Sequence, residues 1–332
     1  MLSQKTGVYL ETEMAASTKY SSQTKKWPWR KLAILVILLI FLYVVVPQIK
    51  VLSPSIHSLA HARIIYILLA VCVFVATYFV AAVMYMLLRK HKLLYGRTLL
   101  VQVSSGFANR LLPAGLGGMG LIAQYLRSQG HTGSEAVTVV GMDNTIGLVG
   151  HFGLFFGIIA LGNVTLTQLH LPHITWSIYF ILVITAVFIA LVVIFQRFRI
   201  RLMLSLKNVF SEVLGYRENP LRLMLAILDS ILLTLLYVSI LWLCANALRV
   251  ELPMTKILIV FTAGALVGTA TPTPGGLVGT EAGLFGGFVA YGVSDSTALA
   301  IALLYRLITY WLPIVPGLAA FTIAQRKLKL FG

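Results

Sequence analysis

Charged residues are scarce in this sequence, at 11% of 332 residues, while hydrophobic residues make up 59%. A soluble protein of this length needs more polar surface, so the composition excludes the soluble classes and is typical of a chain that crosses a membrane several times. Acidic residues are fewest, 10 against 26 Lys and Arg, with a formal net charge of +16. In a membrane protein this excess indicates which loops face the cytoplasm, and we expect no nucleic-acid partner.

Cysteine is also nearly absent. Cys72 and Cys244 both lie inside apolar runs, so we expect neither a disulfide framework nor a metal site. The glycine run at 115–120 matches a dinucleotide-binding fingerprint in form. No strand is predicted before it and no βαβ unit around it, so we expect no cofactor. Nor does any Ser/His/Asp set or carboxylate pair indicate catalysis, and a transporter is expected rather than an enzyme.

Two glycine- and proline-rich breaks interrupt the apolar sequence, one before 120 and one around 272. Proline removes a backbone donor and blocks the preceding helical turn, and hydrocarbon cannot satisfy the polar groups that are freed. Such backbone is tolerated only when it is packed in protein or lines a wet cavity. We therefore predict two re-entrant hairpins, at 98–128 and 256–291. Their breaks are formed by Pro113, Gly115, Gly117, Gly118, Pro272, Pro274, Gly275 and Gly276.

The remaining apolar runs are long enough to cross the bilayer, which requires about 20 residues of helix. They predict an all-α polytopic membrane protein with six full transmembrane helices. A polar tail at 1–30 precedes them, and a basic tail at 326–332 follows. The six predicted spans are 31–49, 64–88, 132–161, 174–195, 221–248 and 297–323.

An internal repeat relates the two halves of this map. Residues 98–106 align with 256–264, and the elements on either side correspond. The halves 31–161 and 162–325 each contain three spans and one hairpin. Because three is odd, the second half is expected to be inverted relative to the first, as in many secondary transporters. The segments rich in Lys and Arg then fall on one side, which predicts cytoplasmic termini.

Five ionisable residues lie at membrane depth on this map. Each costs about 2.5–3.5 kcal/mol at the centre of a membrane helix on insertion scales, so we expect them to face inward and one another. Arginine suits phosphate because its planar fork can donate two parallel hydrogen bonds. A structural role is compatible, with Arg110 paired to Glu281 or Arg306 to Asp143 to hold the hairpins closed. The five residues are Arg110, Asp143, Asp229, Glu281 and Arg306.

These motifs together resemble a flippase-like family that includes the membrane region of lysylphosphatidylglycerol synthases and stand-alone archaeal relatives linked to dolichol-phosphate sugars. The resemblance covers roughly 30–325. Its motifs are Asn109-Arg110-x-x-Pro113-x-Gly115-x-Gly117-Gly118, Asp143, Pro272-x-Pro274-Gly275-Gly276 with Glu281, Gly292, Tyr305-Arg306 and Pro313-x-x-Pro316-Gly317.

The resemblance implies lipid translocation between leaflets, in a bacterial cytoplasmic membrane or an archaeal cell membrane. It implies that Arg110, Glu281 and Arg306 are functional, and its motifs add Asn109 and Tyr305 to the substrate-binding candidates. The soluble aminoacyl-transferase domain of the synthases is not found, so we do not expect the chain to make lysylphosphatidylglycerol.

The resulting expectation is a flippase for an anionic phospholipid or a lipid-phosphate headgroup, polyprenyl-phosphate-linked or aminoacylated. The expected partners are membrane lipids, and the sequence leaves open whether the protein forms a homodimer. One alternative is a secondary transporter of a small anionic solute, which shares the architecture but needs no lateral opening to lipid. The other is a membrane-embedded transferase, for which Asp143 and His151, on one predicted helix, are the candidates.

Overall fold

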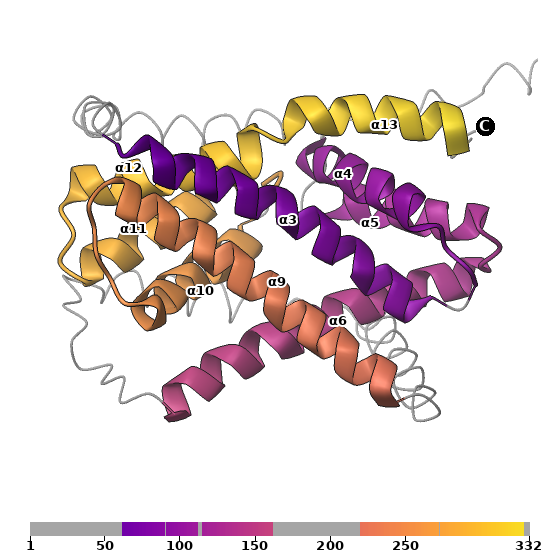
Figure 1. The fold of residues 1–332 in the computed structure, drawn as a ribbon, viewed down its shortest axis with the longest axis horizontal. Coiled ribbons are helices and arrows are strands. Elements are labelled where there is room, and N and C mark those ends of the chain that lie inside the picture. Colours follow the sequence, from indigo (N-terminus) through magenta and orange to yellow (C-terminus); the bar gives the residue numbers. More distant parts are fainter. Residues whose placement is uncertain (1–61, 90, 112–114, 162–219, 272, 329–332) are drawn as a thin grey trace, which may run out of the picture. The chain divides into compact units, whose positions relative to one another are not determined.

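The elements of the described chain are helices, shown in Figure 1. The first group is α3 (Ile64–Leu88), α4 (Tyr95–Leu111), α5 (Leu116–Ser128) and α6 (Gly133–Leu161). The second is α9 (Pro220–Ala247), α10 (Met254–Ala270), α11 (Gly279–Ala290), α12 (Asp295–Arg306), the π-helix η3 (Leu307–Trp311) and α13 (Ile314–Leu328). This computed structural model describes residues 62–89, 91–111, 115–161, 220–271 and 273–328.

Within these residues, 4 helical segments are long and apolar enough to cross a membrane. They confirm the spans expected at 64–88, 132–161, 221–248 and 297–323 and make the chain an integral, polytopic membrane protein. The predicted spans at 31–49 and 174–195, with the tail at 1–30, lie outside the described residues. The four segments are Ile64–Leu88, Gly133–Ile158, Pro220–Ala247 and Asp295–Leu328.

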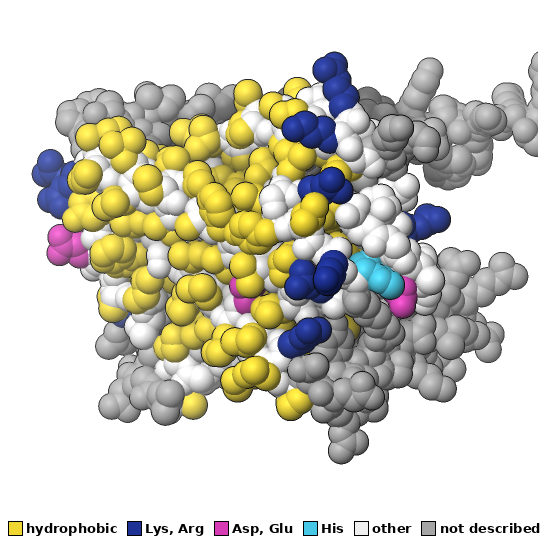
Figure 2. All heavy atoms as spheres, turned by 45° about the vertical axis from the view of Figure 1, so that its right-hand side comes forward, with side chains coloured by type: hydrophobic (Ala, Val, Ile, Leu, Met, Phe, Trp, Pro, Cys, Tyr) yellow, Lys and Arg dark blue, Asp and Glu magenta, His cyan; other side chains and the backbone are white. Residues whose placement is uncertain are grey.

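Lipid-compatible side chains cover a broad part of the surface. Figure 2 shows hydrophobic side chains on one face, bordered on both sides by Lys and Arg. Leu68 is 55% exposed, Phe79 46% and Leu228 52%. In water such a surface would drive aggregation, whereas in a bilayer it contacts acyl chains at no cost.

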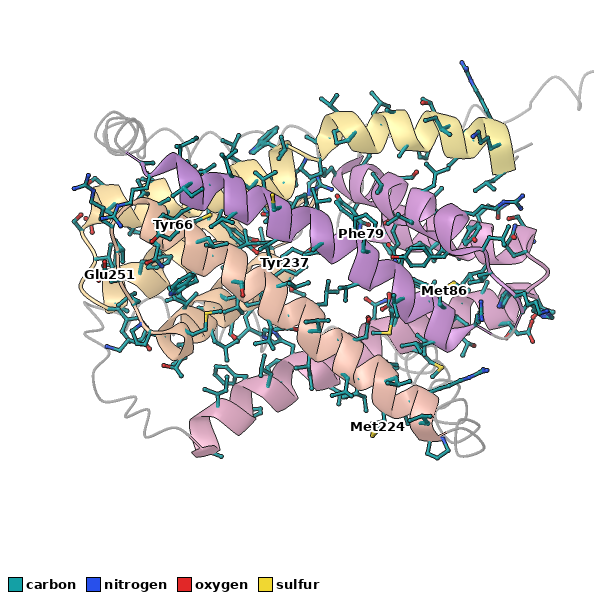
Figure 3. All side chains as sticks on the ribbon, viewed as in Figure 1. Tyr66, Phe79, Met86, Met224, Tyr237 and Glu251 are labelled. Atoms are coloured by element: carbon teal, nitrogen blue, oxygen red, sulfur yellow. The ribbon has the colours of Figure 1, made fainter. Side chains whose placement is uncertain are left out.

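The first helices of the two groups, α3 and α9, run antiparallel and pack along their lengths. The backbone N–H of Arg63, just before α3, donates to the carbonyl of Ala247, the last residue of α9, at 2.9 Å. Figure 3 accordingly shows Met86 and Met224 toward one end of the pair and Tyr66 toward the other. The short helices that follow each long helix therefore begin at opposite ends of the pair.

Both expected breaks appear as gaps between short helices. In the first, Gly115 adopts a left-handed φ of 71° before α5, and the N–H of Gly118 donates to Oδ1 of Asn109 at 2.7 Å. In the second, Gly275 and Gly276 have φ of 62° and 65°, a region that suits glycine. Pro113 and Pro272 lie outside the described residues. Each of the two segments is thus a pair of shorter helices with a break between them, as the glycine and proline clusters predicted.

The two helices of the second pair, α10 and α11, pack closely through a row of glycines. A Cβ added at Gly283 would lie 2.7 Å from the carbonyl oxygen of Ala263, and one at Gly279 would lie 2.0 Å from Oγ1 of Thr271. A Cβ at Gly287 would meet Val260 at 2.9 Å. Because Gly279, Gly283 and Gly287 are four residues apart, they lie on one face of α11 and allow the two helices to approach closely.

We predict that Gly283→Ala destabilises the protein, because its methyl group forces α10 away from α11. Overpacking of this kind typically costs about 1–3 kcal/mol. Thermal denaturation of the detergent-solubilised variant measures the loss. Gly286→Ala on the same helix is the matched control, since a Cβ there meets nothing within 4 Å. Equal melting temperatures for the two variants would contradict the packing argument.

The last span is not a continuous α-helix, which the sequence analysis did not anticipate. Its middle turn is η3, where the N–H of Leu312 donates to the carbonyl of Leu307, five residues earlier, at 2.8 Å. Pro313 follows and has no N–H, so the carbonyl of Thr309 lacks the donor that an α-helix would supply four residues on. A π-turn next to a proline is a recognised cause of a bend, and it leaves carbonyls in need of other donors.

Candidate functional site

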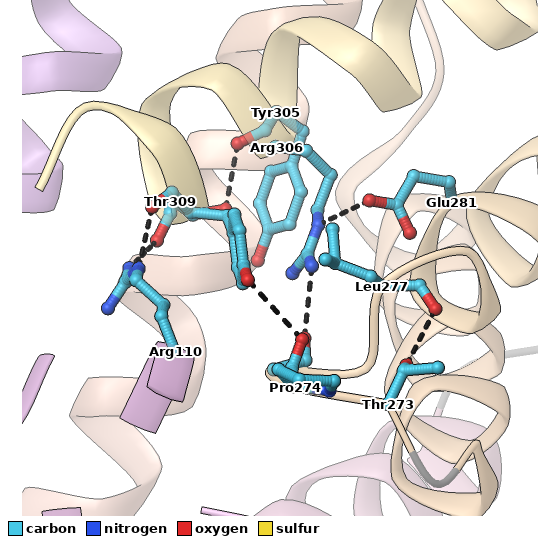
Figure 4. Close-up of polar contacts among 10 residues, drawn as sticks. Arg110, Thr273, Pro274, Leu277, Glu281, Tyr305, Arg306 and Thr309 are labelled. Atoms are coloured by element: carbon cyan, nitrogen blue, oxygen red, sulfur yellow. Dashed lines mark hydrogen bonds and ion pairs between the residues drawn. The ribbon is translucent and has the colours of Figure 1, made fainter. Parts of the chain in front are cut away.

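Arg306, the last residue of α12, joins the last span to the second hairpin. Its Nε donates to Oε1 of Glu281, on α11, at 2.8 Å, and its Nη2 donates to the carbonyl of Gly275 at 3.0 Å (Figure 4). The residue is only 7% exposed. A buried charge needs a partner and satisfied donors, and the hairpin supplies both.

Arg110, near the end of α4, joins the first hairpin to the same span. Its Nη2 donates to the carbonyl of Thr309 at 2.7 Å, and its Nε donates to the carbonyl of Tyr310 at 2.6 Å. Pro313 cannot supply a donor to Thr309, so the guanidinium takes the place of the missing main-chain N–H. The break in the last span and the arginine are therefore parts of one arrangement.

The ring of Tyr310 lies between the two guanidinium groups. Cζ of Arg306 is 4.4 Å from the ring centroid, and Cζ of Arg110 is 5.1 Å from it. Both distances are within the range of a cation–π interaction, worth about 0.5–2 kcal/mol according to how far the pair is desolvated. The hydroxyl of Tyr310 donates to the carbonyl of Pro274 at 3.4 Å. One side chain thus contacts both arginines and the second hairpin.

The two arginines differ in charge balance. Arg306 has Glu281 as its counter-ion, whereas no carboxylate of the described chain lies within ion-pair distance of Arg110. Both pairings weighed from the sequence are therefore wrong in this structure: Arg110 does not pair with Glu281, nor Arg306 with Asp143. Arg306 pairs instead with Glu281, on the second hairpin. Arg110 is left as a net positive charge.

A cavity of about 430 Å³ lies beside this charge and is called the arginine cavity below. Aromatic rings with hydroxyl groups and both guanidinium groups line it. A pocket of this size, apolar with a few convergent polar groups, is typical of a binding site for a small molecule or headgroup. Its defining residues are Tyr78, Arg110, Tyr237, Tyr305, Arg306 and Tyr310.

A second cavity, of about 540 Å³, adjoins the first and is called the acidic cavity below. It is lined by Asp143 and Asn144 of α6 and by Tyr85 of α3. The hydroxyl of Tyr85 donates to Oδ2 of Asp143. The two cavities share wall residues from both hairpins, among them Gln102 and Asn109 of α4, Gly275 and Thr280.

The structure brings most of the predicted site residues to these two cavities. Asn109 lines both, and the carbonyl of Tyr305 accepts a hydrogen bond from Oγ1 of Thr309 at 2.8 Å. Gly117 packs against the backbone, since a Cβ there would lie 1.9 Å from the carbonyl oxygen of Ala108. The glycines that line the acidic cavity are Gly115, Gly118, Gly275 and Gly276.

Other ionisable residues of the spans lie apart from the arginine cavity. Nε2 of His151 is 3.3 Å from Oγ1 of Thr262, which fits a core histidine with a polar partner. Oδ2 of Asp229, on α9, is buried and has no hydrogen-bond partner among the described residues. A buried carboxylate oxygen does not suit a side chain that only extends toward water.

Sequence reasoning found Tyr305 but missed the other tyrosines of the two cavities. Tyr310 contacts both arginines, Tyr85 binds Asp143, and Tyr78 and Tyr237 complete the arginine cavity. Tyr310 lies four residues after Arg306, on the same helix face, and this spacing was an available signal. The other three lie on long apolar helices, where nothing in the pattern separates a cavity-facing tyrosine from one at the membrane interface.

Comparison with known proteins identifies the class. Residues 30–317 match the family described as the lysylphosphatidylglycerol synthase TM region, and the chain belongs to that family.

One relative is a UPF0104 membrane protein from Methanothermobacter thermautotrophicus, 36% identical over 72 residues. That alignment covers 22% of this chain and 22% of the relative. Membership confirms the resemblance found in the sequence.

We predict that Glu281→Leu destabilises the protein because it leaves Arg306 buried without a counter-ion. Removing one partner of a buried ion pair typically costs about 3–5 kcal/mol. The double variant Glu281→Leu/Arg306→Met should recover most of this loss, since replacing both charges by apolar groups is often neutral. Thermal denaturation of wild type, Glu281→Leu and the double variant in detergent measures the loss and its recovery. A double variant no more stable than Glu281→Leu would show that the pair is not coupled in this way.

Proposed function

We propose that this protein is a flippase that moves a lipid with an anionic phosphate headgroup between leaflets, and that it is not an enzyme. The observation that carries the proposal is Arg110, a guanidinium that lines the arginine cavity and has no carboxylate partner among the described residues. A net positive charge in a membrane interior is costly unless an anion compensates it. A phosphate headgroup is the compensating anion that a lipid supplies.

The chemistry of the arginine cavity supports phosphate in particular. Nε and Nη2 of Arg110 donate to carbonyls, and Nη1 has no hydrogen-bond partner among the described residues that would compete with a ligand oxygen. Tyr78 and Tyr237 bring phenol hydroxyls to the same cavity. Charge-assisted hydrogen bonds from arginine to phosphate are short and strong, and hydroxyl donors complete the shell of a phosphate group.

The architecture of the proposal is an inverted repeat of two halves, 31–161 and 162–325, with six spans and cytoplasmic termini. The antiparallel packing of α3 and α9, and the shared order of long, short, short and long helices, support it. In such repeats the substrate site lies near the bilayer midplane, between broken helices. The two halves rock around the cavities and expose the headgroup to each leaflet in turn.

The family supports a membrane lipid as the partner and a bacterial cytoplasmic or an archaeal cell membrane as the location. The lipid class extends to polyprenyl-phosphate-linked and aminoacylated headgroups, since all of them present a phosphate. Under this proposal Asn109, Arg110, Tyr305 and Arg306 surround the headgroup in the arginine cavity. Glu281 holds Arg306 in place, and Asp143 lies in the adjoining cavity.

We predict that Arg110→Ala slows lipid movement about 10- to 100-fold, because a hydrogen bond to a charged group contributes about 1.5–3 kcal/mol. Reconstituted vesicles that contain fluorescent phosphatidylglycerol, quenched from outside, measure the rate. Arg127→Ala, an exposed arginine at the end of α5, is the matched control and should keep the wild-type rate.

Equal rates for Arg110→Ala and wild type would remove the site assignment. Vesicles loaded with inorganic phosphate test the small-solute alternative in the same preparation. Phosphate efflux that depends on Arg110, without lipid movement, would replace the flippase by a solute transporter.

A further inference from the structure

The acidic cavity has no role in binding phosphate, because its ionisable groups repel anions. Asp143 is at its wall, hydrogen-bonded to the hydroxyl of Tyr85. This cavity nevertheless adjoins the arginine cavity through walls made by both hairpins. A change of charge in one cavity therefore changes the electrostatic free energy of an ionisable group in the other, because the protein interior between them is poorly polarisable.

Within the described part of the chain, few other ionisable groups surround Asp143. The elements packed against α6 are α3, α5, α9 and α10. The first brings Tyr85, and α9 brings Asp229, which interacts electrostatically with Asp143. The residues with which α5 and α10 line the acidic cavity are uncharged: Gly118, Met119, Ile122, Ala265, Gly268 and Thr269. Among the described residues that line the two cavities, Arg110, across the shared wall, is the cation without a carboxylate in contact.

Among the described intramembrane groups, the empty site has two cations, Arg110 and Arg306, and three acids, Asp143, Asp229 and Glu281. Arg306 is balanced by Glu281 in direct contact, which leaves the positive Arg110 and the negative Asp143 in adjoining cavities. When a phosphate binds Arg110, that positive charge is neutralised by the ligand. Asp143 is then a buried anion without a cation, with Asp229 as a second acid nearby. A buried carboxylate without a cation is unfavourable in free energy, and one proton on it removes the negative charge.

We infer that Asp143, hydrogen-bonded to Tyr85, binds one proton whenever a phosphate headgroup binds Arg110, so that lipid movement is a proton symport. This inference rests on the proposed function. The proton comes from the water on the side where the headgroup binds and bonds to a carboxylate oxygen of Asp143. It returns to water on the other side when the headgroup leaves. No bond of the lipid is made or broken.

A proton fits this site better than a metal cation does. A metal ion needs several oxygen ligands, and the described residues contain no group of three or more His, Cys, Asp or Glu side chains that could hold one. A proton needs one carboxylate. Because a phosphodiester carries one negative charge and the proton one positive charge, the coupled movement is electroneutral. The distribution of the lipid between leaflets should therefore depend on a pH gradient and not on the membrane potential.

The test uses full-length protein in vesicles with fluorescent phosphatidylglycerol, with valinomycin and equal potassium holding the potential at zero. An imposed gradient of about one pH unit should enrich the lipid up to about tenfold in the leaflet on the alkaline side, since one unit is a factor of about ten in proton activity. Asp143→Asn should lose this enrichment. Asp295→Asn, an exposed acid at the start of α12, is the matched control and should retain it.

A second measurement does not depend on transport by the variant. Short-chain phosphatidylglycerol added to purified wild-type protein in weakly buffered detergent should raise the pH, through uptake of about one proton per lipid bound, by the charge compensation described above. Asp143→Asn should lose the uptake, and Tyr85→Phe should keep it, because the carboxylate remains.

The outcomes separate the two proposals. Movement that depends on Arg110 but does not respond to the pH gradient, with no proton uptake on binding, would overturn the proton symport and leave the flippase standing. A response to a sodium gradient in place of the pH gradient would overturn it as well. Absence of any lipid movement by wild-type protein would overturn the proposed function itself.

Discussion

Backbone carbonyls that lose their helical donors inside a membrane need replacements, and the arrangement of this protein depends on how they are supplied. The last span breaks at η3 and Pro313, and the guanidinium of Arg110 donates to the carbonyls of Thr309 and Tyr310. Hydrocarbon offers no donor of its own. An arginine that would be costly in lipid and a helix break that would be costly in lipid therefore stabilise each other.

The second hairpin is held by the same logic at a different place. Arg306 binds the carbonyl of Gly275 in the break and the carboxylate of Glu281 in the helix that follows. Tight packing of α10 on α11 through Gly283 keeps the two helices of this hairpin together. Because Tyr310 contacts both guanidinium groups, the two hairpins and the last span meet at one side chain.

The two arginines differ in the charge of their partners. Arg306 has a carboxylate and a carbonyl as partners, whereas Arg110 has two carbonyls and keeps a net charge beside a cavity. Under the proposals above, a headgroup that binds Arg110 neutralises the cation beside the cavity of Asp143 and so favours protonation of that acid. The proposed movement of an anionic headgroup and its proposed coupling to a proton are two consequences of the same charge distribution.

Sequence alone was sufficient for the elements whose cause is local. Long apolar runs define the spans at 64–88 and 221–248, and clustered glycine and proline define the breaks, since lipid leaves a chain few other options. The five intramembrane charges were visible as a set for the same reason. Which of them pair was decided only by tertiary structure: Arg306 with Glu281, Asp143 with Tyr85, and Arg110 with two carbonyls. Pairing depends on how residues far apart in the chain, such as Arg110 and Tyr310, are brought within 3 Å by helix packing, and no local pattern encodes that distance.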